Sequence, residues 1–305
     1  MGTKTFFIST LAAFLSVTIT ACEPVEPEVF QRPDTWWLEI EDGDGVFDDF
    51  RYKIENGGVV IIRYEGDSEN VTMPAEIEEI PVTIIGIHAF REKSLMGVDI
   101  PNSVVFIGKC AFSENLLTDI VIPDGVTFIG ESAFRNNLLT GVAIPDNVTS
   151  IEDMSFFSNN LTDVIIGSRC TSIGENAFSK NKLTNVVIPD SVTIIKKRAF
   201  AWNELTSLTL GSSVTSIGWL AFGSDHLTSI VFPNSLTSIS SGSFYGNLLT
   251  EITISANVQI EDWPSDIALE RWSMYEHFCN EYISGGRIAG KYIRPDINST
   301  IWVKQ

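Results

Sequence analysis

One arrangement of apolar and polar positions repeats every 22 residues from Phe90 onward. In each of eight consecutive units a phenylalanine occupies the same slot, and a leucine follows it five residues later. The two columns are Phe90, Phe112, Phe134, Phe156, Phe178, Phe200, Phe222 and Phe244, and Leu95, Leu117, Leu139, Leu161, Leu183, Leu205, Leu227 and Leu249. An unbroken period of this length is typical of a solenoid, in which each coil buries its apolar face against its neighbours. The pattern therefore predicts a repeat architecture and argues against a conventional enzyme.

The unit of residues 117–138, LTDIVIPDGVTFIGESAFRNNL, predicts two short strands in each coil. Its stretches LTDIVI and VTFIG are rich in β-branched residues and are separated by a Pro-Asp-Gly turn. Apolar alternation in the first stretch directs Ile120 and Ile122 inward. The AFRNN segment that follows is too short for a regular helix, so we expect a single helical turn there.

An asparagine recurs three residues after the phenylalanine of the unit. This column consists of Asn115, Asn137, Asn159, Asn181, Asn203 and Asn247, with Asp225 substituting once. A short amide at a fixed corner satisfies backbone groups that a turn leaves open. We therefore expect a ladder of asparagine hydrogen bonds along the stack.

The unit resembles the leucine-rich repeat of the BspA-like, Treponema-type family, whose pattern is roughly L-x-x-I-x-I-P-x-x-V-T-x-I-G-x-x-A-F. The resemblance covers residues 71–260 and departs mildly from the pattern, as where Gly167 and Gly211 replace the turn proline. It implies a leucine-rich-repeat solenoid that is mainly β, with two short strands and one helical turn in each 22-residue coil. It also implies a role in adhesion to extracellular matrix, host cells or other bacteria.

The residues on either side of the repeats predict two caps, since a solenoid exposes a raw edge at each end. Residues 36–79 contain two β-rich stretches around Asn56-Gly57-Gly58 and predict an N-terminal β-hairpin cap. The solenoid itself is assigned to residues 80–260. Residues 261–305 predict a small α+β C-terminal cap, formed by a helix from Ile267 to Tyr282 and a hairpin after it.

The first residues of the chain are similar to a bacterial lipoprotein leader. Lys4 precedes an uncharged, mostly apolar stretch that is short for a bilayer span. The sequence ITAC that ends at Cys22 looks like a lipobox, which implies removal of residues 1–21 and lipidation of the Cys22 thiol. The alternative is an ordinary signal peptide with a chance cysteine. The acidic, proline-rich residues 22–35 predict an extended tether.

Composition narrows the choice of partner. The net charge of −19 and the pI near 4.4 disfavour nucleic acid and anionic lipid, because both require a basic surface. Contact with a membrane is therefore expected through the lipid anchor only. Besides Cys22 the chain has Cys110, Cys170 and Cys279, which occupy unrelated positions and are expected to be buried thiols.

No motif of the sequence predicts a catalytic, metal or cofactor site. The histidines His88, His226 and His277 are far apart and show no ligand spacing with Cys, Asp or Glu. No nucleophile elbow, phosphate loop or paired-carboxylate motif occurs. The run from Glu41 to Asp49 alternates Asp with Gly as calcium loops do, but the EF-hand frame fails. We expect a solvated acidic turn, with calcium binding as the alternative.

The strongest candidate for function is the outward face of the first strand. If Ile120 and Ile122 point inward, two columns of side chains point outward. The first column is Asp119, Gly141, Asp163, Asn185, Ser207, Ser229 and Glu251, and the second is Val121, Ala143, Ile165, Val187, Thr209, Val231 and Thr253. An exposed apolar stripe with polar flanks is typical of an interaction site. The alternative is that β-branched residues are there only because they form strands well.

A second candidate is a basic patch. Its members fall in adjacent repeats and are Lys180, Lys182, Lys196, Lys197 and Arg198. In an acidic protein such a patch favours an anionic partner, for example a sulfated glycan. The alternative is a solvated face without a ligand.

These features together predict an exported, non-catalytic binding protein, lipid-anchored to the bacterial outer membrane or cell surface. The expected partner is a protein of the host matrix, the host cell or another bacterial surface. The alternative is a periplasmic or envelope scaffold that assembles with other bacterial envelope proteins.

Overall fold

The computed structural model describes residue 43, residues 45–261 and residues 274–305, with only the backbone described for residues 274–276. The chain divides into two compact units, Met1–Glu41 and Asp42–Gln305, and every described residue belongs to the second. The expected leader, Cys22 and the tether lie outside the described residues, as do most of the acidic run before Gly45 and the expected helix start at Ile267.

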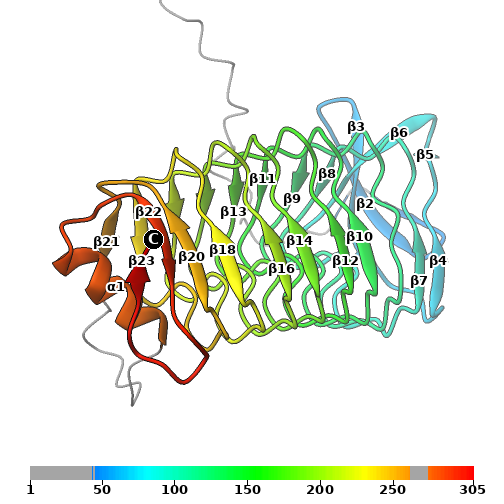
Figure 1. The fold of residues 1–305 in the computed structure, drawn as a ribbon. Coiled ribbons are helices and arrows are strands. Elements are labelled where there is room, and N and C mark those ends of the chain that lie inside the picture. The colour runs from blue at the N-terminus through cyan, green and yellow to red at the C-terminus, as the bar shows by residue number, and fades with distance from the viewer. Residues whose placement is uncertain (1–42, 44, 262–273) are drawn as a thin grey trace, which may run out of the picture. The chain divides into compact units, whose positions relative to one another are not determined.

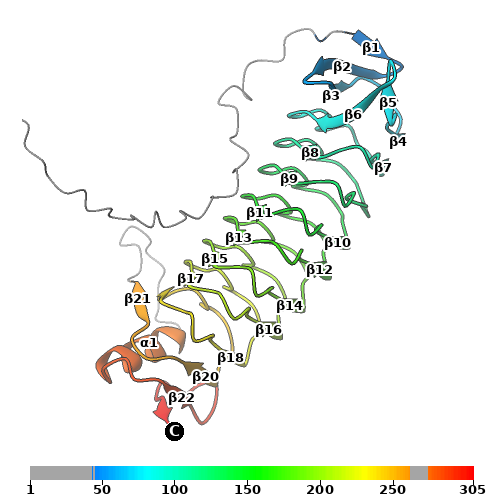
Figure 2. The ribbon, with the colours of Figure 1, turned by 90° about the horizontal axis from the view of Figure 1, so that it is seen from above.

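The predicted mainly-β solenoid is confirmed, with coils that stack side by side and contribute strands to two rows (Figure 1). The first row comprises β4 (Asn70–Thr72), β7 (Gly97–Asp99), β10 (Gly141–Ala143), β12 (Asp163–Ile165), β14 (Asn185–Val187), β16 (Ser207–Thr209), β18 (Ser229–Val231) and β20 (Glu251–Ile254). The second comprises β6 (Ile80–Ile85), β8 (Phe106–Ile107), β9 (Phe128–Ile129), β11 (Ser150–Ile151), β13 (Ser172–Ile173), β15 (Ile194–Ile195), β17 (Ser216–Ile217), β19 (Ser238–Ser240) and β21 (Gln259–Glu261). Figure 2 shows the two rows on opposite sides of the stack.

Within each row the paired strands are parallel, because each coil repeats the path of the one before it. From β6 to β19, partners across the second row are 22 residues apart, as in Ile151 with Ile173 and Ile173 with Ile195, and the last step, from Ile239 to Ile260, is 21. This register brings identical slots of the repeat into contact from coil to coil. Every column seen in the sequence is therefore a column in space.

The N-terminal end of the second row is closed by the expected hairpin. Strands β2 (Phe50–Glu55) and β3 (Gly58–Tyr64) pair antiparallel, and β1 (Gly45–Phe47) adds to β2. The two turn residues, Asn56 and Gly57, both have positive φ, which a tight hairpin of this kind requires. Because β3 also pairs parallel with β6, the hairpin continues the sheet of the coils. The short β5 (Glu76–Ile77) pairs antiparallel with β6.

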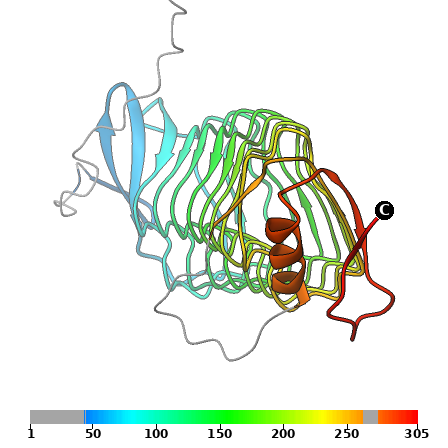
Figure 3. The ribbon, with the colours of Figure 1, turned by 60° about the vertical axis from the view of Figure 1, so that its left-hand side comes forward.

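The last coil is covered by a helix and a second hairpin (Figure 3). The helix is α1 (Met274–Ser284), and β22 (Gly290–Ile293) pairs antiparallel with both β20 and β23 (Val303–Lys304). Four aromatic rings pack together beneath them: Phe278, Tyr282, Tyr292 and Trp302. The Tyr282 hydroxyl donates to the Ser255 carbonyl at 2.7 Å and thereby ties the helix to the last coil.

The ladder phenylalanines form one continuous stack through the solenoid. Consecutive rings lie 5.0 to 5.4 Å apart with nearly parallel planes, and none of them is accessible to solvent. Tyr64 of β3 extends the stack by packing on Phe90 at 5.5 Å. The cap thus joins the same aromatic column as the coils, which explains how a hairpin of unrelated sequence fits the end of the array.

The structure differs from expectation at the segment around each phenylalanine, which we name the corner: the nine residues from four before it to four after it. Two consecutive tight turns replace the single helical turn. Around Phe134 they are closed by Ala133 N–H to the Gly130 carbonyl and Arg135 N–H to the Ser132 carbonyl. Ser132, the third residue of the first turn, is left-handed (φ 58°), and so is Asn136, which follows the second turn (φ 53°). This conformation prevents a helix from continuing.

The expected asparagine ladder is confirmed and joins two adjacent coils at each rung. Asn137 accepts the Leu117 N–H at 3.2 Å and donates to the carbonyls of Phe112 and Phe134 at 2.9 and 3.2 Å. The other asparagines of the column repeat this pattern, and all are almost fully buried except Asn247, which is half-buried. Each rung satisfies backbone groups that would otherwise be buried without partners.

Asp225 interrupts the ladder with a carboxyl group. Its Oδ1 accepts the Leu205 N–H at 3.2 Å, but its buried Oδ2 has no hydrogen-bond partner among the described residues. A carboxylate cannot donate to the carbonyls that an asparagine would serve. Burial raises the pKa of Asp225 to about 7, because the charged form is poorly solvated there.

This substitution predicts a pH-dependent loss of stability. The folded-state pKa of Asp225, about 7, lies above its unfolded value of about 4. Its contribution to the free energy of unfolding is therefore complete below about pH 4 and is lost as the pH rises through about 7. Asp225→Asn should therefore raise the free energy of unfolding by about 1–3 kcal/mol at pH 8, and by less at pH 5. Urea unfolding at both pH values measures this. A gain equal at both would contradict the account.

The phenylalanine stack predicts a large cost for its truncation. Phe134→Ala should lower the free energy of unfolding by about 3–5 kcal/mol, since the ring is fully buried between two others. Val121→Ala is the control, because that side chain is 81% exposed and should change stability by less than about 0.5 kcal/mol. Thermal or urea unfolding compares the two variants. Similar losses would mean that the stack is not the core.

Candidate binding surfaces

The outward columns of the first row lie where alternation places them. In β12 the side chains of Asp163 and Ile165 are exposed, whereas Val164 between them faces the core. The most exposed members are Val121 at 81%, Ile165 at 69%, Val231 at 64% and Val187 at 56%. We name the two columns together the strand face.

The polar column of the strand face is exposed as well. Asp119, Asp163, Asn185, Ser207 and Ser229 are open to solvent, and Gly141 and Glu251 are half-buried. Glu251 pairs with Lys291 of β22 at 2.8 Å, so the C-terminal cap covers that end of the column. Residues 119–121 keep the same alternation without forming a regular strand. Thr209 of the apolar column is exposed, and Thr253 is half-buried.

The strand face is not a uniform sheet, because its strands associate in pairs. β10 pairs with β12, β14 with β16, and β18 with β20. Gly211, which follows β16, allows a close approach to the previous coil, since a Cβ there would lie only 2.2 Å from the Pro189 carbonyl oxygen. No hydrogen-bonded ladder joins β16 to β18 in the described chain.

A hollow of about 550 Å³ opens at the β16–β18 junction. Its lining includes Leu208 and Thr209 of β16 and the residues that occupy the same slots in β18, Ile230 and Val231. Ser229 and Pro233 complete this part of the lining. Asp190 at its edge accepts the Ser212 N–H at 2.7 Å, and this hydrogen bond holds the pKa of the carboxyl below its usual range. The hollow therefore has an apolar floor and a negatively charged rim.

Charge is divided between the two sides of the coils. Outside the corners, the repeats carry one basic side chain, Arg169, and these acidic ones: Asp99, Asp119, Asp124, Asp146, Asp163, Asp190 and Glu251. All other lysines and arginines of residues 80–260 lie in the corners: Arg91, Lys93, Lys109, Arg135, Lys180, Lys182, Lys196, Lys197 and Arg198. The strand side is thus acidic. The corners hold nearly all the positive charge of the repeats together with eight acidic residues: Glu92, Glu114, Glu131, Glu152, Asp153, Glu175, Glu204 and Asp225.

The corners between Phe134 and Phe222 also gather aromatic rings around these cations. Arg135 and Lys180 both lie over the Phe157 ring, at 5.6 and 5.3 Å from its centroid. Arg198 lies over both Trp202 and Trp219, at 5.8 and 4.6 Å. We name these six residues the cation–aromatic patch: Arg135, Phe157, Lys180, Arg198, Trp202 and Trp219.

Of the basic residues expected to cluster, Lys180 and Arg198 belong to this patch and Lys197 borders it, 5.4 Å from the Trp219 centroid. Lys196 and Lys197 are partly neutralised by Asp153 and Glu175, at 3.4 and 3.5 Å. Lys182 is exposed in the last slot of its corner, beyond the buried Asn181.

Sequence reasoning missed four of the six patch residues: Arg135, Phe157, Trp202 and Trp219. These residues are separated by up to four repeats, and in most other coils their slots hold small, polar or charged residues such as serine, alanine, glycine, asparagine, lysine, glutamate or aspartate. The available signal was their departure from the period. An aromatic residue in a slot that other coils fill with small or polar residues is not required by the core.

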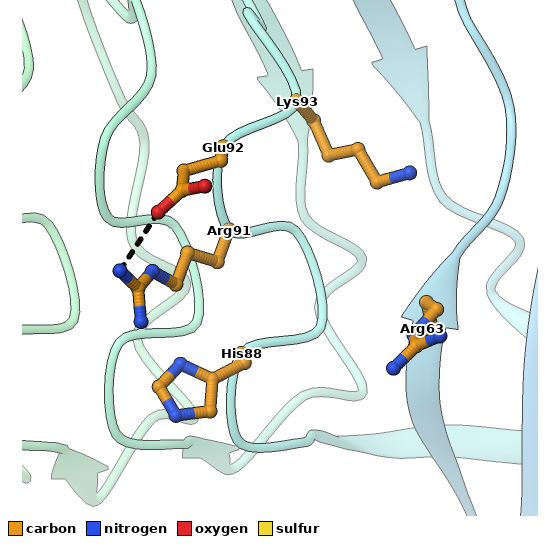
Figure 4. A pocket seen from close by; sticks show the side chains of 5 residues that line it. All are labelled: Arg63, His88, Arg91, Glu92 and Lys93. Carbon is orange, nitrogen blue, oxygen red and sulfur yellow. Dashed lines mark ion pairs between the residues drawn. The ribbon is translucent and has the colours of Figure 1, made fainter.

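A separate basic hollow of about 590 Å³ lies at the first corner (Figure 4). Arg63 of β3 faces His88, Arg91, Glu92 and Lys93 across it, and Arg91 pairs with Glu92 at 2.7 Å. Burial, and then the charges of Arg91 and Lys109, lower the pKa of His88. The imidazole is therefore neutral at physiological pH and adds no charge to the hollow.

The described residues provide little for catalysis or metal binding. Within the described ranges no three His, Cys, Asp or Glu side chains converge as ligands. No disulfide links Cys110, Cys170 and Cys279 to one another; Cys170 and Cys279 are buried as expected, whereas Cys110 is half-buried. Burial raises the pKa of Cys170 to about 11, which disfavours the reactive thiolate. The same part of the chain has no helix long and apolar enough to cross a bilayer.

Comparison with known proteins places this architecture among bacterial leucine-rich repeat proteins. Residues 83–204 and 171–263 match the BspA type leucine rich repeat region, in six copies. A leucine-rich repeat protein from Bacteroides ovatus is 25% identical, with a TM-score of 0.57 over 72% of this chain and 67% of that one. The T. pallidum leucine-rich repeat protein is 25% identical, with a TM-score of 0.35 over 65% of this chain and 75% of that one. The pneumococcal vaccine antigen PcpA is 20% identical, with a TM-score of 0.47 over 71% of this chain and 76% of that one. Comparison with curated proteins gives no match.

Proposed function

This chain belongs to the BspA-type leucine-rich repeat family, and on that premise we propose that it is a non-catalytic module that binds a protein through its strand face. The observation that carries the proposal is the row of exposed β-branched side chains on a sheet whose backbone is held rigidly by the buried columns. A soluble protein rarely leaves such a row open without a partner.

The dimensions of the strand face suit a protein partner. Seven rungs at about 4.8 Å each span roughly 30 Å, which is the width of a standard protein interface. The hollow between β16 and β18 offers a pocket for one anchoring side chain near the middle of the later coils. Asp190 at the edge of this hollow, with Asp119 and Asp163 of the strand face, favours a partner with an apolar centre and basic flanks.

The finer part of the proposal concerns where this binding takes place. We propose that the protein is exported, is lipid-anchored through Cys22 and acts at the bacterial surface as an adhesin. Support comes from the lipobox-like sequence that ends at Cys22 and from the surface role that the family resemblance implies. Multiple acyl chains would hold such a protein stably, whereas a single chain binds a membrane only marginally.

The rival proposal is a periplasmic scaffold that assembles with other envelope proteins and never meets a host. It uses the same strand face and differs only in location. Treatment of intact cells with an added protease separates the two. The adhesin proposal predicts cleavage of the protein on intact cells, and full protection that is lost only after lysis would contradict it.

Charged substitutions on the strand face should abolish binding of the protein partner without unfolding the chain. Ile165→Asp combined with Val187→Asp places two charges in adjacent rungs of the apolar column. Both side chains are more than half exposed, so thermal stability should remain nearly unchanged. Recovery of a partner from matrix or serum by the soluble chain, starting at Glu23, should fall at least tenfold.

The matched control is Leu116→Asp with Leu138→Asp, which changes two exposed side chains of adjacent coils in the corner. This pair should leave partner recovery unchanged. Equal losses for both pairs would contradict a specific role for the strand face. Unfolding of the Ile165 and Val187 variant would mean that these side chains are part of the core.

A further inference from the structure

We propose that the cation–aromatic patch is a second binding site, and that it takes a linear polysaccharide carrying carboxylate or sulfate groups. This site lies in the corners and is distinct from the strand face. The inference stands whether or not the strand face binds a protein, because it depends on different residues and a different ligand.

The positive charge of the patch predicts that its ligand is an anion. The protein carries −19 overall, yet Arg135, Lys180 and Arg198 form no ion pair within the described part of the chain. Three uncompensated cations on one side of a strongly acidic protein attract an anion locally. Acidic side chains pair with the neighbouring Lys196 and Lys197 instead, which leaves the patch itself open.

Aromatic contacts hold these cations in fixed positions. Arg198 contacts two indole rings, and Phe157 lies beneath both Arg135 and Lys180. A cation fixed on a ring loses less side-chain entropy when it binds an anion than a freely rotating one does. Trp202 is itself 40% exposed, so its ring offers an open apolar surface beside the charges.

The patch runs along the solenoid, which favours a linear ligand. Its residues come from five successive corners, and ladder rings in adjacent corners are 5.2 to 5.4 Å apart. The patch therefore extends over roughly 20 Å at about 5 Å a coil. One coil step is comparable to the length of one sugar residue, so a polysaccharide can meet the same surface chemistry repeatedly.

Small residues at the centre of the patch leave a shallow depression between its larger side chains. Ser179, Ala201 and Gly223 occupy one slot in three consecutive corners, and all are buried. Phe157 fills that slot in the preceding corner. Side chains of Lys180 and Trp202, which follow Ser179 and Ala201, thus stand beside a shallow floor. The sugar rings of a polysaccharide fit such a surface, with their C–H faces against the Trp202 indole and their anionic groups near the cations.

An acidic protein is the competing occupant, and the observations favour it less. A folded partner would need a broad apolar contact, and the only side chains of the patch that offer apolar area are separate aromatic rings. Alternating rings and cations suit a ligand that itself alternates apolar ring faces with charged groups.

Binding of heparin, alginate and neutral dextran to the chain from Glu23 onward tests the proposal by calorimetry. We expect heparin or alginate to bind, dextran not to bind, and the affinity to fall as salt is raised. Lys180→Ser with Trp202→Ser should weaken binding at least tenfold. Serine already occupies this slot at Ser158 and Ser224, so the corner should tolerate it. Trp202→Phe alone should retain most of the affinity.

Two single substitutions are matched controls for loss of charge. Arg169→Ser removes the basic residue of the strand side, and Arg91→Ser removes one from the hollow of the first corner. Each should change the affinity less than twofold. The proposal is overturned if both weaken binding as much as the patch variant does, if neither polyanion binds, or if poly-glutamate binds as tightly as alginate. The Ile165 and Val187 double variant should bind the polysaccharide normally.

Discussion

The structure depends on the contact of each buried side chain with its own copy in the next coil. A phenylalanine ring packs on phenylalanine, and an asparagine amide satisfies the same backbone groups at each rung. Because like contacts like, the slots of neighbouring coils stay in register at a step of 22 residues from Phe90 to Phe244. At the two ends the packing continues although the step changes: Tyr64 stacks on Phe90, and the Tyr282 hydroxyl accepts the Val258 N–H of the last coil.

The same constraint leaves the outward slots free to vary. Neither Val121 nor Trp202 is needed by the core, and the two belong to surfaces of opposite character. Acidic residues and β-branched side chains mark the strand face, whereas cations on aromatic rings mark the corner. A single rigid array can thus present two chemically different surfaces. A binding partner can be added by changing surface slots without cost to the fold, which is consistent with the use of repeat proteins as interaction modules.

Much of the fold and of the strand face was predictable from the sequence, because residues in the same slot of successive repeats lie next to one another in the stacked coils. The phenylalanine stack, the asparagine ladder and the exposure of Ile165 all follow from the period and from alternation. The double turn at the corner was missed, since the left-handed position accepts residues as different as His88, Ser132 and Arg198 and carries no compositional mark. The pairing of strands was missed because successive units carry similar strand residues, so the repeat pattern does not show which neighbours form a ladder. Contacts between repeats, such as Arg198 with Trp219, depend on side-chain reach, which no single repeat reveals.

An alanine scan of one coil, residues 178–199, tests most directly the claim that folding and binding occupy separate slots. Each variant would be measured for unfolding free energy and for binding of protein and polysaccharide ligands. The account predicts that losses of stability fall on buried slots such as Phe178, Asn181 and Val186. Losses of binding without loss of stability should fall on exposed slots such as Val187 and Lys180. Binding losses that appear only where stability is also lost would contradict it.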